Sequence, residues 1–484
     1  MTARLFDRTR ILDPNHQMKR KQDDKKPGRP ESPPDLEPHA DDPDVVDTIE
    51  ADVEAAPGVV TGRLFSGGGV LAAFGHRDFS LLWGGAFVSN MGTLIQNTVL
   101  LWYVKELTGT NGWVAAVNFA NFAPIIIFVL WAGSLADRVD RRRLIIETQV
   151  VMMLAALTLG ITTSLGVTSI WVIMLVTVVI GIAFALNFPA WRALVPDIVP
   201  MEDLLNAVAL DAAGYNMARF LGPAVGGVIL AAWAGNPAAA FYINAASFLA
   251  VIVALTLIQA RPAMKPVTIS GRQHVREGLR YLKQRAWMLK LLATLGVSTF
   301  FGLSMVVLLP AFAKDVLHGS SWSFVLLMGG VGLGASIAAP TVTRLNRDFE
   351  ERQIIKVGLT GVALSLLLLA ASKYLWLSLI ATTAVGMSFL VVSASMVTIL
   401  QSRVEREMRG RIMSFYILVF QGSAPIGGLL LGFLADRTSA PTAMFVGGGL
   451  VGLMALAVNI FPSILRDAYA GGAERDPEMP VTLP

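Results

Sequence analysis

The sequence predicts an all-α membrane protein with twelve transmembrane helices, arranged as two pseudo-symmetric bundles of six helices. Three observations support this prediction. The chain is 54% hydrophobic and only 15% charged, whereas soluble domains carry about 25% charged residues. Apolar runs of the roughly 20 residues needed to cross a bilayer recur along the chain. Finally, the second half of the chain repeats features of the first.

The two ends of the chain differ from the rest in composition. Residues 1–76 contain a basic block followed by prolines and acidic residues, so they lack the apolar surface needed to order themselves. They also contain no apolar core of the length found in signal peptides. We expect 1–76 and 463–484 to be disordered cytoplasmic tails.

Twelve predicted spans fall into two groups of six. Within an N-terminal bundle at 77–259 they cover 80–105, 112–136, 143–165, 168–190, 206–234 and 237–259. Within a C-terminal bundle at 288–462 they cover 288–313, 321–343, 354–371, 374–400, 412–435 and 438–462. The basic linker at 260–287 places Val275, Leu279 and Leu282 on one helix face, which predicts an amphipathic helix on the cytoplasmic surface. A plain solvated linker is the alternative.

Positive charge is distributed unevenly between the loops. Arginines crowd the segment 133–143, and more Lys and Arg gather in the linker and in the loops after the eighth and tenth spans. Since cytoplasmic loops are enriched in Lys and Arg, we expect both termini to be cytoplasmic. The predicted location is a bacterial inner membrane, with the chain crossing the lipid bilayer many times.

The two halves share sequence patterns. The fifth span contains Gly222, Pro223, Gly226 and Gly227, which we predict to be a helix-packing motif, and the eleventh contains a related Pro-x-Gly-Gly pattern. Aligning the prolines places Arg219 opposite Gln421. The loop at 344–347 is a weakened counterpart of 133–143. Duplicated six-span halves are typical of transporters whose substrate site lies between the halves.

These features resemble the major facilitator superfamily. The segment 133–143 matches that family's G-x-L-A-D-R-x-x-R-R loop motif, with Asp140 where the family often has Gly, and Ala218 departs from the family's span-five motif. Arg77-Asp78-Phe79 and Glu277-Gly278-Leu279-Arg280-Tyr281 resemble the branch of siderophore and drug exporters that includes the enterobactin exporter. The resemblance covers about 77–462 and implies the major facilitator fold. It also implies that a charged cluster latches the two halves, comprising Gly133, Asp137, Arg138, Arg141 and Arg142. A simple topology signal is the alternative.

Arg219 is the most informative single residue inside a span. It falls near the bilayer centre at 1.5 Å per residue, where a charge is costly and marks a functional site by default. Asp211, Tyr215 and Arg219 are spaced to share one helix face. Arg219 therefore binds an anionic substrate group or couples to a carboxylate, or else it is a structural arginine bonded to carbonyls or to Asp211.

Several amides interrupt the apolar spans and form a second set of substrate or coupling candidates. Such amides most often bond between helices, but several together can line a cavity for a polar cargo. The set comprises Asn90, Gln96, Asn97, Asn118, Asn121 and Gln421.

Other chemistry is not indicated. The nucleotide-binding pattern G-x-x-x-x-G-K-[ST] is absent, and all five histidines lie in the tail or the loops. We expect no enzyme activity, catalytic residues, metal site or cofactor. The formal charge of +4 gives no reason to expect a nucleic-acid partner, and we expect a monomer.

The sequence therefore predicts a secondary transporter that works by alternating access. Its predicted cargo is a small hydrophobic or amphipathic molecule such as a siderophore or drug, exported in exchange for protons as the family resemblance implies. An importer of a small metabolite is one alternative. A membrane sensor or scaffold that retains the fold without transporting is another.

Overall fold

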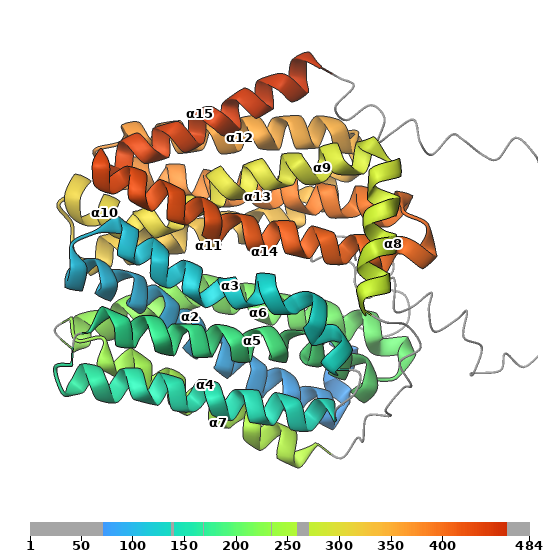
Figure 1. Cartoon of the computed structure of the whole chain (residues 1–484), viewed down its shortest axis with the longest axis horizontal. Coiled ribbons are helices and arrows are strands. Elements are labelled where there is room, and N and C mark those ends of the chain that lie inside the picture. The colour runs from blue at the N-terminus through green and yellow to red at the C-terminus, as the bar shows by residue number, and fades with distance from the viewer. Residues whose placement is uncertain (1–70, 137–139, 168, 234, 259–270, 462–484) are drawn as a thin grey trace, which may run out of the picture.

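The computed structural model of the chain describes residues 71–136, 140–167, 169–233, 235–258 and 271–461 (Figure 1). Every regular element in these ranges is helical, with no strand among them. The first half comprises η1 (Ala72–Gly75), α2 (Arg77–Thr108), α3 (Asn111–Ala136), α4 (Arg141–Ser164), α5 (Ile170–Ile198), α6 (Met201–Ala232) and α7 (Ala238–Leu257). These observations agree with the predicted all-α class.

A surface helix, α8 (Gly271–Gln284), connects the first half to the second. The second half begins with one long segment made of α9 (Ala286–Val297), η2 (Ser298–Gly302), η3 (Leu303–Leu308), α10 (Leu309–Ala311) and η4 (Phe312–Val316). It continues with α11 (Ser321–Asp348), α12 (Glu351–Ala371), α13 (Leu375–Arg403), α14 (Arg406–Arg437) and α15 (Ala440–Ile460).

Ten helical segments of the described chain are long and apolar enough to cross a membrane, counting α9 to η4 as one. The other two predicted spans are helices as well, α2 and α6, each 32 residues long. Amides lower the hydropathy of α2, and charged residues do so in α6. The membrane prediction is supported, and the count of twelve spans stays a prediction.

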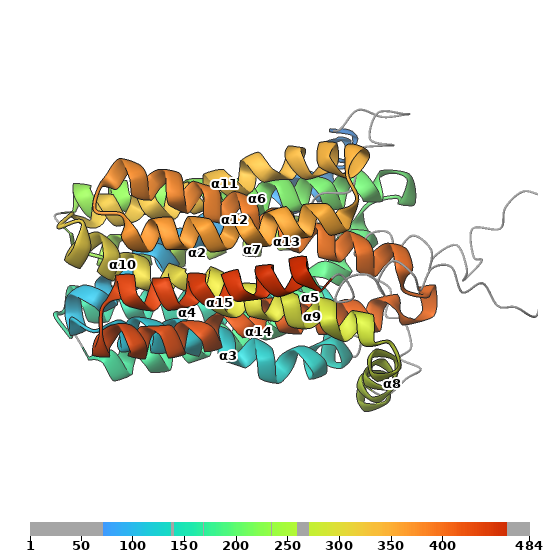
Figure 2. The same ribbon diagram turned by 90° about the horizontal axis from the view of Figure 1, so that it is seen from above.

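The long helices run alongside one another in two bundles (Figures 1 and 2). In the first, α7 packs on α2 and α4, and α5 packs on α3 and α4; in the second, α13 packs on α11 and α12, and α15 on α12. Both ends of the described chain lie at the same end of the molecule as α8 (Figure 1). We call this the linker end, and the opposite end, near α10, the far end. The predicted domain limits stay predictions.

The predicted amphipathic helix is present as α8 and lies across the linker end (Figure 1). Tyr281 and Leu282 are buried, and Glu277 forms a 2.8 Å ion pair with Arg411 of α14. Arg285, just beyond α8, lies 3.7 Å from the centre of the Tyr281 ring, and burial raises the pKa of the Tyr281 phenol. α8 therefore packs on α9 and α14 of the second half and on α3 of the first, while Leu279 of the predicted apolar face is 41% exposed.

The segment from α9 to η4 departs from regular α-helix over most of its second part. η2 and η4 are π-helical turns, and η3 is a 3₁₀ helix. Ser304 donates a 2.8 Å hydrogen bond to the carbonyl of Ala424 in α14, and the carbonyl of Phe300 lies directly against Gly427 of α14. Close packing against α14 thus accompanies the irregular turns, which are often found at functional sites.

Candidate functional site: the interface between the two halves

Two helix pairs make most of the described interface between the halves, α3 with α14 and α6 with α11, and smaller contacts join α3 to η3 and α2 to α10 and α11. In the first pair, Gly422 of α14 faces Ile126, and Gly432 lies against Ala115 nearer the far end. A Cβ atom at Gly432 would lie 2.7 Å from the Cβ atom of Ala115, so only glycine permits this approach. α3 and α14 therefore run antiparallel and in close contact up to the far end.

The Gly-Pro motif of α6 packs against helices of both halves. A Cβ atom at Gly222 would lie 2.7 Å from the Cβ of Leu94 in α2, and one at Gly226 would lie 3.5 Å from the carbonyl of Ile95. A Cβ atom at Gly227 would lie 2.6 Å from a methyl group of Val325 in α11. Pro223 is buried between these contacts. The small residues thus lie at close helix crossings.

Arg219 lies where α6 crosses α11 of the other half. A Cβ atom at Gly332 of α11 would lie 3.2 Å from the Arg219 carbonyl oxygen. The Arg219 side chain is half-buried, and no hydrogen bond or ion pair involves it in the described part of the chain. Asp211 instead interacts with Trp191 and Arg192 of α5. Its predicted helix-face neighbour Tyr215 is 45% exposed.

The candidate amides divide into two groups. Gln96 is buried and accepts a 2.9 Å hydrogen bond from Asn244 of α7, so it joins two helices within the first half. The remaining candidates are half-buried, and within the described ranges their side chains have no hydrogen-bond partner: Asn90, Asn97, Asn118, Asn121 and Gln421. Only this second group has free polar groups to offer to a cargo.

Part of the predicted arginine cluster holds the first half together. Arg141, at the start of α4, donates 2.7 and 3.2 Å hydrogen bonds to Asp197 and to the carbonyl of Ala193 in α5. Arg142 donates 3.1 Å hydrogen bonds to the carbonyls of Thr256 and Ile258 at the end of α7. Cations are favourable at helix C-termini, where carbonyls lack intrahelical partners. Both arginines therefore join helices of the same half.

Of the other three members of that cluster, only Gly133 lies within the described residues. Gly133 lies in α3, while Asp137 and Arg138 lie outside the described residues. The latching role implied by the family resemblance stays a prediction.

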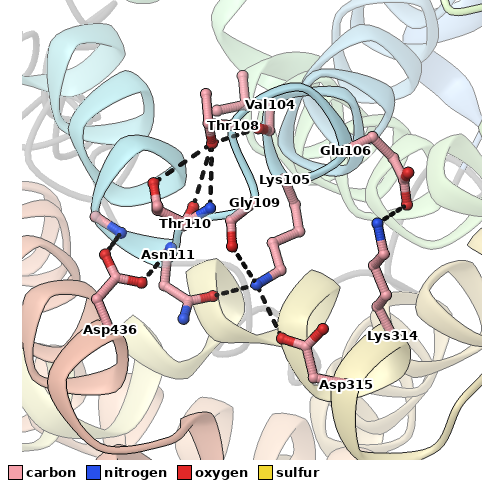
Figure 3. A network of polar contacts seen from close by, with 11 residues as sticks. Val104, Lys105, Glu106, Thr108, Gly109, Thr110, Asn111, Lys314, Asp315 and Asp436 are labelled. Carbon is pink, nitrogen blue, oxygen red and sulfur yellow. Dashed lines mark hydrogen bonds and ion pairs between the residues drawn. The ribbon is translucent and has the colours of Figure 1, made fainter.

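The far end contains a cross-half polar network that the sequence analysis missed (Figure 3). Lys105 of α2, only 4% exposed, forms a 2.9 Å ion pair with Asp315 of η4. Glu106 forms a 2.8 Å ion pair with Lys314. We call the following residues the far-end network: Lys105, Glu106, Asn111 and Gly112 of the first half, and Lys314, Asp315 and Asp436 of the second.

Asp436, at the end of α14, completes the far-end network (Figure 3). Its two carboxylate oxygens accept hydrogen bonds of 2.6 and 2.7 Å from the backbone N–H groups of Asn111 and Gly112. The sequence did hold a signal for this residue. Residues 432–437 repeat residues 133–138 of the family motif with one difference, Phe433 in place of Ser134.

The model of a family described as transmembrane secretion effector matches residues 68–479. Macrolide efflux protein A of Streptococcus pyogenes is 22% identical, covering 80% of this chain and 96% of that protein. The staphyloferrin A transporter of Staphylococcus aureus is 26% identical, covering 72% and 88%. A multidrug efflux pump of Mycobacterium bovis is 25% identical, covering 69% and 81%.

Solved structures support the same fold at low sequence identity. A nucleoside transporter has a TM-score of 0.65 at 13% identity, covering 79% of this chain and all of that one. A peptide transporter has a TM-score of 0.65 at 15% identity, covering 81% and 96%. These structures support the predicted fold, and the family model and the relatives confirm the predicted resemblance to the major facilitator superfamily and its siderophore and drug exporters. The comparisons also confirm that the chain is a transporter and not an enzyme.

Proposed function

Because the chain belongs to the transmembrane secretion effector family, we propose that it exports a small hydrophobic or amphipathic molecule, either a siderophore or a drug, by alternating access. The functions of its relatives support this proposal, since these proteins are efflux proteins for macrolides and other drugs and a transporter for a siderophore. These functions favour an exporter over the alternative of a metabolite importer. The interface between the halves is the natural place for the cargo.

The lone guanidinium of Arg219 is the observation on which the proposed site depends. It sits in the middle of a membrane-length helix, at the crossing with the other half, without a partner in the described residues. Burying such a cation is costly unless it is paired, so a cargo with an anionic oxygen group would compensate for it. The half-buried amides, from Asn90 to Gln421, would supply further hydrogen bonds.

The orientation of the molecule follows from its charges. The linker end holds the Arg141–Arg143 run, the basic face of α8 and the ends of the described chain. We assign this end to the cytoplasm of a bacterial inner membrane because positive loops remain on that side. The far end then faces outward. A monomer with both termini in the cytoplasm is the simplest arrangement.

Energy for export would come from a proton gradient, with Asp211 as the candidate proton-binding carboxylate. It is a carboxylate within a span, half-buried beside Trp191 and Arg192. The predicted gating role of Asp137 and Arg138 belongs to the same proposal. Arg141 and Arg142 would keep the first half rigid while it rocks against the second.

Uptake of two fluorescent dyes into inside-out membrane vesicles tests this proposal. Fluorescein is anionic and rhodamine 6G is cationic, although their ring systems are alike. We expect Arg219→Ala to reduce fluorescein uptake about tenfold relative to rhodamine 6G, which corresponds to one lost charge-assisted hydrogen bond. Arg219→Lys should restore part of it, because Lys keeps the charge and loses the planar fork.

The matched control is Arg437→Gln, which removes an exposed cation at the far end. This variant should take up both dyes as wild type does. If Arg219→Ala took up each dye as well as wild type does, Arg219 would not belong to the substrate site. If a set of dyes, macrolides and ferric siderophores were never moved, the chain would be a non-transporting scaffold.

A further inference from the structure

Asp436 binds the start of a helix that belongs to the other half of the protein. α3 begins at Asn111, so the N–H groups of Asn111 and Gly112 are among the four that its own helix leaves without partners. Asp436 accepts both, at 2.6 and 2.7 Å. A carboxylate at this position is also favoured by the positive end of the helix dipole. The contact therefore combines two hydrogen bonds with a favourable charge.

Close packing fixes the position of this carboxylate. The Phe433 ring, one turn before Asp436 in α14, lies against Gly112, where a Cβ atom would be 2.9 Å from the ring edge and 2.8 Å from an Asp436 oxygen. Asn111 also accepts a 3.3 Å hydrogen bond from Lys105, which in turn pairs with Asp315. The Asp436 contact and the ion pair between Lys105 and Asp315 are thus linked through Asn111 (Figure 3).

The sequence around Asp436 supports a role in conformational change. Residues 432–437 read Gly-Phe-Leu-Ala-Asp-Arg, and residues 133–138 read Gly-Ser-Leu-Ala-Asp-Arg. Residues 432–437 end α14 at the far end, and Gly133 to Ala136 end α3 at the linker end, while Asp137 and Arg138 lie outside the described residues. Because α3 and α14 are antiparallel neighbours, the described parts of the two copies lie at opposite ends of this helix pair. Only the far-end copy lies wholly within the described residues.

We propose that Asp436 is a gating residue that holds the far end closed by capping α3, and that it releases α3 whenever the far end opens. The inference rests on the proposed alternating access, since a cargo can leave at the far end only after α3 and α14 separate there. Asp436 itself is exposed, so water can replace its two hydrogen bonds. The contact is therefore strong enough to bias closure and weak enough to break in each cycle.

Distances between pairs of spin labels test this proposal, and the cysteine-free chain allows such labels without background. One pair, Val167→Cys with Lys373→Cys, reports on the far end from exposed positions in opposite halves. A second pair, Glu202→Cys with Ser402→Cys, reports on the linker end. The measurement uses the full chain in nanodiscs, without cargo.

Asp436→Ala should increase the ratio of far-end-open to far-end-closed molecules about tenfold, with a longer distance between the far-end labels. Asp436→Asn keeps the side-chain shape but removes the charge and turns one acceptor into a donor, so it should shift the ratio in the same direction. It also protects the test if the alanine variant folds poorly. Arg437→Gln, the adjacent control, should match wild type.

Unchanged far-end distances in both Asp436 variants would overturn the gating role, whether or not the protein transports. If the distances shift as expected but no dye or siderophore is moved by wild type, the gate stands and the proposed export fails. The two proposals can therefore fail separately.

Discussion

The charged residues at the two ends of the molecule join different parts of it. At the linker end, Arg141 and Arg142 join α4 to α5 and α7, all within the first half. At the far end, Lys105 and Glu106 of the first half pair with Asp315 and Lys314 of the second. The first set can remain intact throughout a transport cycle. The second set must break whenever the far end opens.

This difference is matched by burial. The side chains of Arg141 and Asp197 are 14% and 18% exposed, so their loss would leave a partly buried charge without a partner. Lys105 is buried, but its partner Asp315 is 51% exposed, and Glu106 is 43% exposed, so water can take over the interactions of both carboxylates. Contacts whose two partners are largely buried stabilise the fold, while contacts between the halves that have an exposed partner bias a conformational equilibrium.

The largest effect is expected from breaking a contact within the first half. Arg141→Gln should lower the free energy of unfolding by about 2 kcal/mol, because it removes charge-assisted hydrogen bonds to Asp197 and Ala193. Thermal unfolding in detergent measures this. Arg143→Gln is the matched control, since the Arg143 side chain pairs with Glu147 on an exposed surface, and the melting temperature of this variant should equal that of wild type. Equal melting temperatures for the two variants would contradict the distinction.

A smaller effect on stability, but a clear one on gating, is expected at Lys105. Asp315→Asn removes the ion pair between the halves and should favour far-end opening by about 1 kcal/mol at most, as for other half-exposed pairs. Lys105→Gln also removes the bonds to Gly109 and Asn111, so it should open the far end further. Labelling of a cysteine at Thr110 by a membrane-impermeant maleimide measures both. If Asp315→Asn had the larger effect, the linkage through Asn111 would be wrong.

The smallest effect is expected from the pair between Glu106 and Lys314. Glu106→Lys places two cations together and should favour opening slightly, by about 0.5 kcal/mol. Adding Lys314→Glu restores opposite charges, so the double variant should behave as wild type. High salt should weaken the effect of the single variant because exposed charges are screened. The same maleimide labelling, repeated at low and high salt, measures this effect. Equal labelling of wild type and all variants would show that the pair between Glu106 and Lys314 has no role in opening.

Much of the fold could be predicted because its signals are local. Membrane-length apolar runs, the motif at 133–143 and the Gly-Pro pattern of α6 are all readable along the chain. The position of Arg219 near mid-membrane followed from residue counting. The lack of a partner for Arg219 among the described residues did not follow in this way, because the pairing of Asp211 with Trp191 and Arg192 depends on how α5 packs on α6.

The far-end network could not be predicted in the same way. Along the sequence, Lys105, Lys314 and Arg437 are sparse charges near the ends of predicted spans, and Asp436 lies at the end of an apolar run. The duplication predicts a counterpart of 133–143 after the eighth span, at 344–347. The closer match, 432–437, instead lies at the far end, where α14 ends. The irregular turns η2 to η4 likewise depend on contact with α14.

A disulfide across the far end tests the central claim most directly. Gly227→Cys and Val325→Cys place two thiols in adjacent helices of opposite halves, α6 and α11, since a Cβ at Gly227 would lie 3.0 Å from that of Val325 and Cβ atoms in disulfides are typically about 3.8 Å apart. Replacing Val325 also removes the methyl groups that would crowd a side chain at position 227.

Dye uptake into inside-out vesicles is then measured before and after reduction with dithiothreitol. Our account predicts that the oxidised protein is inactive, that reduction restores uptake, and that each single-cysteine variant is active in both conditions. Full uptake by the cross-linked protein would contradict the account, because export would then proceed without separation of the two halves at the far end.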